Sequence, residues 1–564
     1  MEKLYLGISL GFNSSACVFS SERGLIAAIS QERLNGQKNT KEIPFDAVRE
    51  CLKLADTNVI DAVAISHYEN LSLDYFKRYG ERFELTGETC QDYVMNYLTS
   101  IGIKVKQPYM TRVNHHTAHA LSTFGFYGVP MRNYYTITSD GFGDGLSAQI
   151  RYGNNVLSNV DLVNSIGLVY QFVTGALGFK EHQHEGKITG LAAFGKPIYL
   201  RDFEALYHRT FVGNGLSFIE SEQLTDEEKE QALKSHIIHF DKFLKLKKTI
   251  YKFINKLTDD GAKREDIAAS VQEFAEKWTC DWIRKNCMMT GANAYLAGGL
   301  FANVKINQRI KDIGIFKNVY VCPAMGDEGT AVGAAVYLHV NSVEDDIADI
   351  NPHDAVLSGT PVGNNVDIDA LIEKGYRVAE FSEDELVSYI AKRLAESNIV
   401  CLKRGRMEFG PRALCHTSIL YNCNTKETNT WLNEKLGRTE FMPFAPVTRE
   451  EVADDLFRNL DGGRDSAKFM TMTFDCTDEF VRDYPAACHV DNTARPQIVS
   501  YNDDQFMWRI LGEYQMLTGK KALINTSFNL HNNPIIESVD VAIDSWMKSD
   551  TDILVIGNTV IEKA

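Results

Sequence analysis

The chain has 564 residues, more than a single hydrophobic core usually organises, so we expect two large domains. Hydrophobic residues make up 44% and charged residues 24% of it, and this composition excludes a largely disordered polypeptide. The formal net charge of −16 gives no general attraction to nucleic acid or anionic membranes, so a phosphate-bearing ligand needs a local cluster of positive groups.

The first residues predict a small antiparallel sheet. Leu4–Leu10, Ala16–Phe19 and Leu25–Ser30 are apolar segments separated by polar turns, which is typical of three strands in a meander. The chain contains no apolar run of the length of a signal peptide or a membrane span, so we expect a cytoplasmic protein with no membrane partner. Its cysteines include no Cys-x-x-Cys pair and are expected to be reduced.

The next elements alternate between strands and helices. A second strand and polar turn begin at Tyr134–Thr138, and two such hairpins favour a duplicated, actin-like α/β core. Residues 202–287 are rich in lysine and glutamate with apolar positions at helical spacing, so we predict a helical insertion there. A polar segment without periodicity separates a first domain, residues 1–356, from a second α/β domain, residues 357–564.

A pair of histidines gives the sharpest local signal. His115 and His119 in N-H-H-T-A-H-A lie four residues apart, the spacing at which two imidazoles on one helical face bind one metal. Asp140 in S-D-G-F-G-D-G and Asp327 in A-M-G-D-E-G-T-A lie in glycine-containing turns, where backbone and ligand can approach closely. Two imidazoles and two carboxylates suit iron, zinc or manganese. The alternative is a pair of packed histidines and two aspartates that stabilise turns.

Two strand-to-helix turns are candidate nucleotide sites. Gly298 and Gly299 end a predicted strand and open a helix, so free backbone N–H groups there suit a phosphate. A second turn contains three glycines, Gly326, Gly329 and Gly333. Tight packing against a sheet is the alternative for these glycines.

Positive side chains concentrate in the second domain. Four of them follow a predicted strand within K-R-G-R-M-E-F-G-P-R-A-L, namely Lys403, Arg404, Arg406 and Arg412. Arginine binds phosphate oxygens through two parallel hydrogen bonds, and the apolar residues between these charges indicate a buried loop rather than a solvated one. Three further cations are expected in the same pocket: Lys435, Arg438 and Arg495. The segment N-T-S-F-N offers amides and a hydroxyl to a ribose, carbamoyl or phosphate group through Asn525, Ser527 and Asn529.

Together these motifs resemble the nodulation-protein-U and tobramycin-type family of O-carbamoyltransferases, and the resemblance runs from Gly7 to the last predicted strand. The matching segments include G-I-S-L-G-F-N-S-S-A, Q-E-R, H-H-T-A-H, D-G-F-G-D, E-G-K-I-T-G-L-A-A-F-G-K-P, A-G-G-L-F-A-N, G-D-E-G-T-A-V-G-A-A, G-R-M-E-F-G-P-R-A-L, F-M-P-F-A-P, A-R-P-Q and N-T-S-F-N. The resemblance implies an N-terminal actin-like (ASKHA) domain similar to the tRNA threonylcarbamoyl transferase, and a C-terminal domain similar to the YrdC proteins.

The resemblance also implies the chemistry and the ligands. The second domain would convert carbamoyl phosphate and ATP into carbamoyl adenylate, and the first would transfer its carbamoyl group to a hydroxyl group. Iron is the expected metal, with zinc, manganese or magnesium as alternatives, and the family's metal positions fall on His115, His119, Asp140 and Asp327. Lys38 falls on a family lysine that faces the reacting phosphate or carbonyl, and Asn303 ends the nucleotide-binding turn A-G-G-L-F-A-N. A homodimer is implied as well.

The chain departs from the family pattern at the position of the residue that would take the proton of the attacking alcohol. The family typically has histidine followed by aspartate in the first turn, and this chain has Asn13 and Ser14. Asparagine cannot act as a general base at neutral pH, so Asn13 is expected to orient the acceptor or the carbonyl. The proton would then go to His116, Asp144, the metal or water.

Two positions also lack a family arginine. Gly36 and Thr417 stand where an arginine is common. The loss of two positive charges weakens phosphate binding unless another side chain replaces them. Lys41, Lys403 and Arg404 are the candidates for this replacement.

The sequence leaves the acceptor open. A small-molecule hydroxyl, on a natural product or a sugar, is the first hypothesis. The alternative substrate is a hydroxymethyl-pyrimidine in a nucleotide or DNA, of the 5-hydroxymethylcytosine type. Nucleic acid would then need a basic stretch such as Lys242–Lys252, whose other interpretation is a solvated helix face. A catalytically impaired nucleotide-binding or regulatory protein, and a sugar kinase or ATPase of the actin-like superfamily, are the remaining alternatives.

Overall fold

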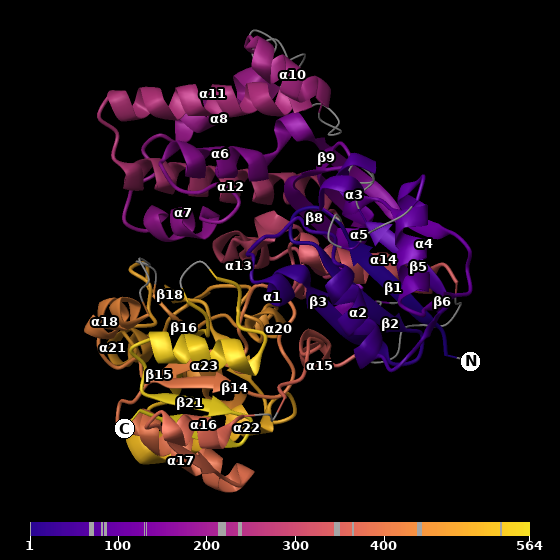
Figure 1. Ribbon diagram of the computed structural model, residues 1–564. Coiled ribbons are helices and arrows are strands. Elements are labelled where there is room, and N and C mark those ends of the chain that lie inside the picture. The colour runs from indigo at the N-terminus through magenta and orange to yellow at the C-terminus, as the bar shows by residue number, and fades with distance from the viewer. Residues whose placement is uncertain are drawn as a thin grey trace.

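The protein has an α/β fold built on three mixed sheets. The computed structural model describes residues 2–66, 73–79, 83, 87–128, 130, 132–211, 222–234, 240–342, 350–363, 366–436, 443–530 and 533–563. Two five-stranded sheets organise the first half of the chain, and an eight-stranded sheet organises the second. Figure 1 shows the second half, in orange and yellow, below a stack of helices and beside the indigo N-terminal sheet. The prediction of an α/β protein is therefore confirmed.

The first sheet has the strand order β3-β2-β1-β5-β7. Its strands are β1 Leu4–Ser9, β2 Ser15–Ser20, β3 Gly24–Ser30, β5 Ala62–Ser66 and β7 Met110–Val113. The first three pair antiparallel, which confirms the predicted meander, and β5 and β7 add parallel strands. Successive residues of β1 and β2 belong to two different apolar clusters, because both faces of this sheet are covered.

The second sheet, β10-β9-β8-β11-β12, repeats this order of three antiparallel strands followed by two parallel ones. Its strands are β8 Tyr134–Gly143, β9 Leu146–Tyr152, β10 Asn155–Asp161, β11 Asn293–Ala297 and β12 Val319–Val321. A short pair, β4 Val59–Ile60 with β6 Lys104–Val105, lies outside both sheets. The repeat confirms the duplicated core predicted from the two hairpins.

Helices fill the connections between these strands. Those outside the central pair are α1 Gln31–Asn35, α2 Phe45–Leu54, α3 Leu73–Tyr79, α4 Cys90–Ser100, α6 Ile166–Ala176, α7 Glu185–Ala192 and α13 Val304–Asp312. Four more form most of the stack at the top of Figure 1, namely α8 Leu200–Phe211, α10 Asp226–Lys234, α11 Phe240–Asp259 and α12 Arg264–Asn286. Among the helices that the structure describes, none combines the length and the apolar composition needed to cross a bilayer.

Two helices pack against each other between the two sheets of the first half. α5 spans His115–Tyr127 and contacts β8 and β11, whereas α14 spans Thr330–Val340 and contacts β1 and β5. A Cβ at Gly333 would lie 1.7 Å from the carbonyl oxygen of Ala118, so only glycine permits this approach. Gly329 is similarly restricted, because a backbone oxygen lies 2.0 Å from the position of its Cβ. These two glycines therefore serve tight packing, the alternative interpretation of their motif.

We expect Gly333→Ala to lower the free energy of unfolding by at least about 3 kcal/mol, because the new methyl group would push α5 and α14 apart. Thermal unfolding followed by circular dichroism would show a lower Tm. Gly186→Ala in α7 is the matched control, since its Cβ would have open space and alanine favours a helix. An unchanged Tm for Gly333→Ala, or an equal loss in the control, would contradict the packing account.

One eight-stranded sheet, β13-β22-β21-β14-β15-β20-β16-β19, organises the second half. Its strands are β13 Arg377–Glu380, β14 Val400–Lys403, β15 Thr417–Tyr421, β16 Ala445–Arg449, β19 Gln497–Val499, β20 Ala522–Ser527, β21 Ile553–Ile556 and β22 Thr559–Glu562. A separate pair consists of β17 Phe474–Asp475 and β18 Thr493–Ala494.

Helices cover both faces of this sheet. The helices of the second half are α16 Ile368–Glu373, α17 Glu383–Ala395, α18 Glu427–Lys435, α19 Ala453–Leu456, α20 Arg464–Ala467, α21 Asp478–Asp483, α22 Gln505–Thr518 and α23 Val539–Lys548. Of these, α17 and α22 pack on one face of the sheet and α23 packs on the other. Val400 and Leu402 of β14 belong to the apolar cluster of α17 and α22. The intervening Cys401 belongs to another cluster, together with Trp546 of α23. Alternate residues of the strand thus face opposite layers.

A short linker helix, α15 Pro352–Val356, lies where the two halves meet. It packs against α5 and β3 of the first half. Arg406, in the loop after β14, donates hydrogen bonds to the carbonyl oxygens of Ile26 at 2.9 Å and Ser358 at 2.8 Å, so it joins the second half to the first. The domain boundary near residue 357 stays a prediction.

Candidate functional site

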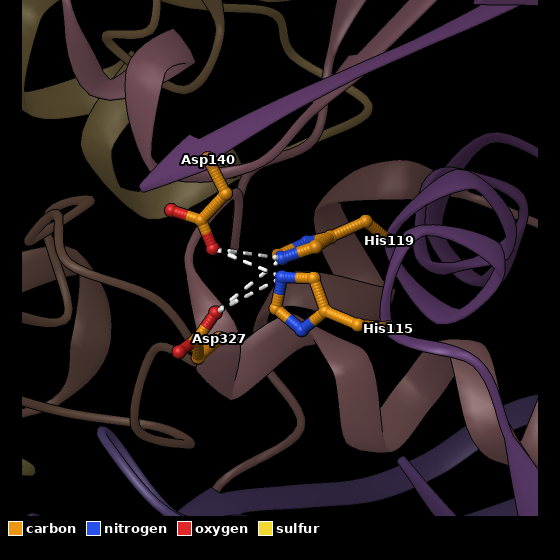
Figure 2. Close-up of side chains that lie close together, drawn as sticks. All are labelled: His115, His119, Asp140 and Asp327. Atoms are coloured by element: carbon orange, nitrogen blue, oxygen red, sulfur yellow. Dashed lines mark hydrogen bonds and ion pairs between the residues drawn. The ribbon is translucent and has the colours of Figure 1, made fainter. Parts of the chain in front are cut away.

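The predicted metal ligands come from three segments and point toward one another, as Figure 2 shows. His115 and His119 lie on one face of α5, because they are separated by about one helical turn. Asp140 lies in β8, and Asp327 begins a single 3-10 turn, η4. The side chain of Asn114 caps α5, so the helix begins at the first of the two histidines.

The four side chains lie within the reach of one metal ion. Nε2 of His115 lies 3.1 Å from Oδ2 of Asp140. Nε2 of His119 lies 3.4 Å from that oxygen and 3.4 Å from Oδ1 of Asp327. Both histidine side chains are fully buried. These donors together could hold a metal ion.

The chemistry of the donors also fits a divalent cation. Both ring nitrogens of His119 and Oδ1 of Asp327 are buried without a hydrogen-bond partner. Burial, and then the charge of Asp140, raises the pKa of Asp327 well above its usual range. Burial opposes the ionisation of Asp140 as well, but the neighbouring imidazoles of His115 and His119 lower its pKa. Two neighbouring buried carboxylates are costly without positive charge, and their combination with imidazoles suits iron, zinc or manganese.

The two turns predicted as nucleotide sites border this cluster. Gly298 has a φ of +109°, and a Cβ there would lie 2.2 Å from a backbone oxygen of β8, so glycine permits the turn to approach the strand. The backbone N–H of Gly299 donates to Oδ1 of Asp140 at 3.3 Å. Gly326 immediately precedes Asp327. The backbone N–H of Gly298 donates to the carbonyl oxygen of Met325 at 2.7 Å, so both N–H groups that were predicted to be free for a phosphate have partners within the protein.

A cavity of about 240 Å³ lies between the helices α7, α12 and α13 and the second half. Its walls include Gln272 and Glu276 of α12, Arg309 of α13 and Arg495 of the second half. Asn303, predicted to bind the nucleotide, caps α13 and exchanges hydrogen bonds of 2.8 and 3.2 Å with Gln272. Its side chain thus shapes the wall of this cavity.

Asn13 and Lys38 lie in two neighbouring parts of the N-terminal region. Asn13 has a φ of +54° in the turn between β1 and β2, and its Oδ1 is buried without a hydrogen-bond partner. Lys38 lines an open cavity of about 670 Å³ together with Lys41 and Arg78. The hydroxyl of Tyr75 donates to the carbonyl of Lys41 at 2.7 Å and accepts from the β1–β2 turn at 2.8 Å. This positive cavity therefore adjoins the turn that carries Asn13.

The two candidate proton acceptors have different surroundings. Nδ1 of His116 lies 2.9 Å from the hydroxyl of Thr138, and its Nε2 is buried without a partner. Burial, with the charges of the neighbouring histidines, lowers the pKa of His116 well below its usual range. Asp144 accepts hydrogen bonds from the backbone N–H of His115 at 2.7 Å and from Asn114 at 3.2 Å. Asp144 therefore holds the start of α5.

Two of the predicted phosphate-binding arginines are engaged in contacts within the protein. Nη1 of Arg404 lies 3.1 Å from Oδ1 of Asp504, and the guanidinium stacks on the ring of Phe506 at 4.0 Å. Arg406 binds backbone carbonyls at the junction between the halves. These contacts hold Arg404 and Arg406 away from a ligand in this structure.

Arg412 and Arg495 have no such partners. Within the described residues, neither side chain forms an ion pair, and Nε of Arg412 is buried without a hydrogen-bond partner. Burial lowers the pKa of Arg412 to about 10, and burial with the charge of Arg412 lowers the pKa of Arg495 well below its usual range. Two neighbouring positive groups in partly buried surroundings fit a phosphate. Lys435 instead pairs with Asp550 at the surface, and Arg438 lies outside the described residues.

The segment N-T-S-F-N begins beside the loop that carries Arg412. Nδ2 of Asn525 donates to the carbonyl of Ala413 at 3.0 Å and to Oε1 of Gln497 at 2.6 Å. Its Oδ1 is buried without a hydrogen-bond partner. The hydroxyl of Ser527 donates to Oδ1 of Asn529 at 2.5 Å. Asn525 thus lies beside the arginine loop, and the other two residues fix the turn after β20.

Two residues to which no motif assigned a role hold this loop in place. Glu408 is buried, and its Oε1 accepts hydrogen bonds of 2.8, 3.0 and 3.0 Å from backbone N–H groups within residues 414–417. Arg33, from the first half, donates to the carbonyl of Gly410 at 2.8 Å, and its Nη1 is buried without a partner. Their only signal in the sequence is their place in the segments Q-E-R and G-R-M-E-F-G-P-R-A-L.

Lys403, a candidate replacement for a lost arginine, is fully buried and donates to the carbonyl of Ile536 at 3.2 Å. Burial lowers the pKa of Lys403 from 10.5 to about 8. Between these two values the unfolded chain binds a proton that the native protein does not, so we expect stability to rise with pH across this window. Lys403→Met should remove this rise and increase stability at pH 7. Urea unfolding at a series of pH values would check this, and identical pH dependence in both proteins would contradict it.

A family model described as Carbamoyltransferase N-terminus matches residues 4–336, and one described as Carbamoyltransferase C-terminus matches residues 391–563. The chain belongs to the carbamoyltransferase family. This carbamoyltransferase is 28% identical to nodulation protein NolNO of Sinorhizobium fredii, over 98% of its own chain and 79% of that protein. It is 32% identical to nodulation protein U of Rhizobium tropici, over 51% of its own chain and 47% of that protein. An uncharacterized protein of Methanocaldococcus jannaschii is 28% identical over 99% of this chain and 100% of its own. The resemblance derived from the sequence motifs is thereby confirmed.

Proposed function

We propose that this carbamoyltransferase forms carbamoyl adenylate from carbamoyl phosphate and ATP in a YrdC-like C-terminal domain, residues 357–564. An actin-like N-terminal domain, residues 1–356, then transfers the carbamoyl group to the hydroxyl of a small molecule. One observation carries this proposal. The first half gathers two histidines and two aspartates within the reach of one metal ion, and the second half places Arg495 near Arg412, whose Nε is buried without a hydrogen-bond partner.

The first step uses the positive groups of the second half. Water cleaves carbamoyl phosphate into inorganic phosphate and carbamate. A carbamate oxygen then attacks the α-phosphorus of ATP, and pyrophosphate leaves. Arg412 and Arg495 bind the phosphate oxygens, and Lys403 adds a third positive charge when protonated. Asn525 offers its buried Oδ1 to the carbamoyl N–H groups.

The second step uses the first half. A divalent metal held by the two histidines and two aspartates would stabilise negative charge on the phosphate and carbonyl oxygens. Oδ1 of Asn13 accepts a hydrogen bond from the acceptor hydroxyl and aligns it with the carbonyl. The hydroxyl oxygen forms the new C–O bond, AMP leaves, and water takes the proton.

The surroundings of the basic stretch Lys242–Lys252 favour a small acceptor over nucleic acid. Lys248 pairs with Glu228 at 2.5 Å, and Lys252 pairs with Glu222 at 2.6 Å. Lys247 pairs with Glu181 at 2.8 Å. These lysines are neutralised within the protein, which weakens the case for a DNA-binding groove. A homodimer in the cytoplasm remains part of the proposal.

Incubation of the purified protein with ATP, carbamoyl phosphate and a panel of hydroxyl acceptors tests this proposal. We expect phosphate, pyrophosphate and AMP in equal amounts, and a mass gain of one carbamoyl group on one acceptor. Hydroxymethyl-pyrimidine DNA belongs in the panel, because a mass gain there would favour the nucleic-acid alternative. Nucleotide binding without release of pyrophosphate would support the catalytically impaired alternative and overturn the proposed function.

A further inference from the structure

A second cluster of metal-binding side chains lies at the junction of the two halves. His353 belongs to the linker helix α15, His416 to the loop before β15, and Asp504 caps α22. Each residue is at most 6% exposed, and one ligand atom of each lies within 4.8 Å of the others. We propose that these three residues bind Zn²⁺, with water as a fourth ligand, and that the metal ties the linker to the second half.

His416 is oriented as metal-binding histidines usually are. Its Nδ1 lies 3.2 Å from the carbonyl oxygen of Arg404, and because a carbonyl only accepts hydrogen bonds, Nδ1 carries the proton. The lone pair is then on Nε2, which faces Oδ2 of Asp504 at 3.6 Å. The ring packs on Gly405, where a Cβ would lie 2.8 Å from Nδ1. A hydrogen bond to the outer nitrogen is the usual way in which a protein fixes the tautomer of a metal ligand.

Both oxygens of Asp504 contact Arg404, and Oδ2 also faces His416 in the cluster. Oδ1 accepts hydrogen bonds from the backbone N–H of Met507 and from Nη1 of Arg404, both at 3.1 Å. Nη1 of Arg404 also lies 3.2 Å from Oδ2. The guanidinium is held in this place by the ring of Phe506. Metal-binding carboxylates are commonly fixed by such outer hydrogen bonds, so Arg404 orients Asp504 here instead of binding phosphate.

The buried ring of His353 is not explained by an ion pair between the other two residues. An ion pair between His416 and Asp504 would account for two members of the cluster. The ring of His353 lies 6.1 Å from that of His416, and its Nδ1 is buried without a hydrogen-bond partner. A buried nitrogen without a partner is unfavourable, because it has lost its hydrogen bonds to water. A metal ion that this imidazole binds would remove that penalty.

The donor set and its position indicate the metal and its role. Two imidazole nitrogens and one carboxylate oxygen suit Zn²⁺, and three protein ligands leave one position for water. His353 lies on α15, which packs against α5, the helix that carries His115 and His119. The other two ligands belong to the second half. The metal would therefore connect the linker helix α15, which lies next to the first cluster, to the start of α22.

Metal content after loading with Zn²⁺ and dialysis tests the site. In a His119→Gln background, which removes the first cluster, we expect about one equivalent of Zn²⁺ to remain. Adding His353→Gln, His416→Gln or Asp504→Asn should remove it. Asp504→Asn is informative because asparagine also caps helices, so α22 keeps its start. Substitution with Co²⁺ should give the visible absorption of a site with nitrogen and oxygen ligands. The variants that no longer bind Zn²⁺ should lack this absorption.

His339→Gln is the matched control, because His339 is also buried with unpartnered ring nitrogens but packs against the rings of Tyr5 and Phe19. It should keep the equivalent of Zn²⁺. EDTA should lower the Tm of the His119→Gln protein and leave that of the His119→Gln/His353→Gln protein unchanged. Folded variants at His353 and His416 that retain full Zn²⁺ would overturn the proposal, whether or not the protein transfers carbamoyl groups.

Discussion

Replacing His119 by alanine is expected to remove the metal of the first cluster and to slow carbamoyl transfer by a factor of at least about 10³, while pyrophosphate release continues. His119 lies 3.4 Å from an oxygen of Asp140 and 3.4 Å from one of Asp327, so it contacts both carboxylates. His115 approaches Asp327 only to 4.0 Å. Elemental analysis and separate assays of pyrophosphate release and acceptor carbamoylation would measure the two effects.

His339→Ala is the control for this experiment. Its ring is as deeply buried, yet its neighbours are aromatic rings and not carboxylates. The control protein should keep the metal and the transfer rate. A His119→Ala protein with full metal content would contradict the assignment of the cluster, and an equal loss of pyrophosphate release would indicate a folding defect instead.

The histidine pair could be predicted from the sequence because helix geometry alone places residues four apart on one face. The apolar segments between polar turns likewise predicted the strands of the first sheet. Alternate side chains of these strands enter two different apolar clusters. The approach of Asp140 and Asp327 is different. They lie in β8 and η4, so their meeting depends on how two sheets pack around α5 and α14, which local spacing does not specify.

The partners of the cations could not be predicted either. The partner of Arg404 is Asp504, 100 positions later in the chain. Arg406 binds the carbonyl oxygen of Ile26, and a backbone carbonyl leaves no signal in the sequence because every residue has one. Both arginines therefore resembled phosphate ligands, although one orients a carboxylate and the other joins the two halves. Only the tertiary structure separates them from Arg412 and Arg495.

Arg495→Met is expected to reduce pyrophosphate release that depends on carbamoyl phosphate by a factor of at least about 10², and to raise the Tm of the ligand-free protein. The side chain lies near Arg412, and burial together with that like charge lowers its pKa. Without a bound anion, two buried like charges lower the stability of the folded protein. A methionine of similar length removes one of these charges and should therefore raise the stability. With phosphate bound, the same charge contributes to binding, so its loss reduces the rate.

The two effects of Arg495→Met have opposite signs, and this separates a binding arginine from a structural one. A structural arginine supports both folding and activity, so its replacement lowers the Tm and the rate together. Arg393→Met is the control, because Arg393 pairs with Glu562 at 2.9 Å on the far edge of the sheet and should affect neither rate nor phosphate binding. Inorganic phosphate should raise the Tm of the wild-type protein and of Arg393→Met, but not that of Arg495→Met, because ligand binding stabilises only a protein that still holds the ligand. If Arg495→Met has a lower Tm and phosphate still raises that Tm as it does in the wild-type protein, the anion binds at a site without Arg495.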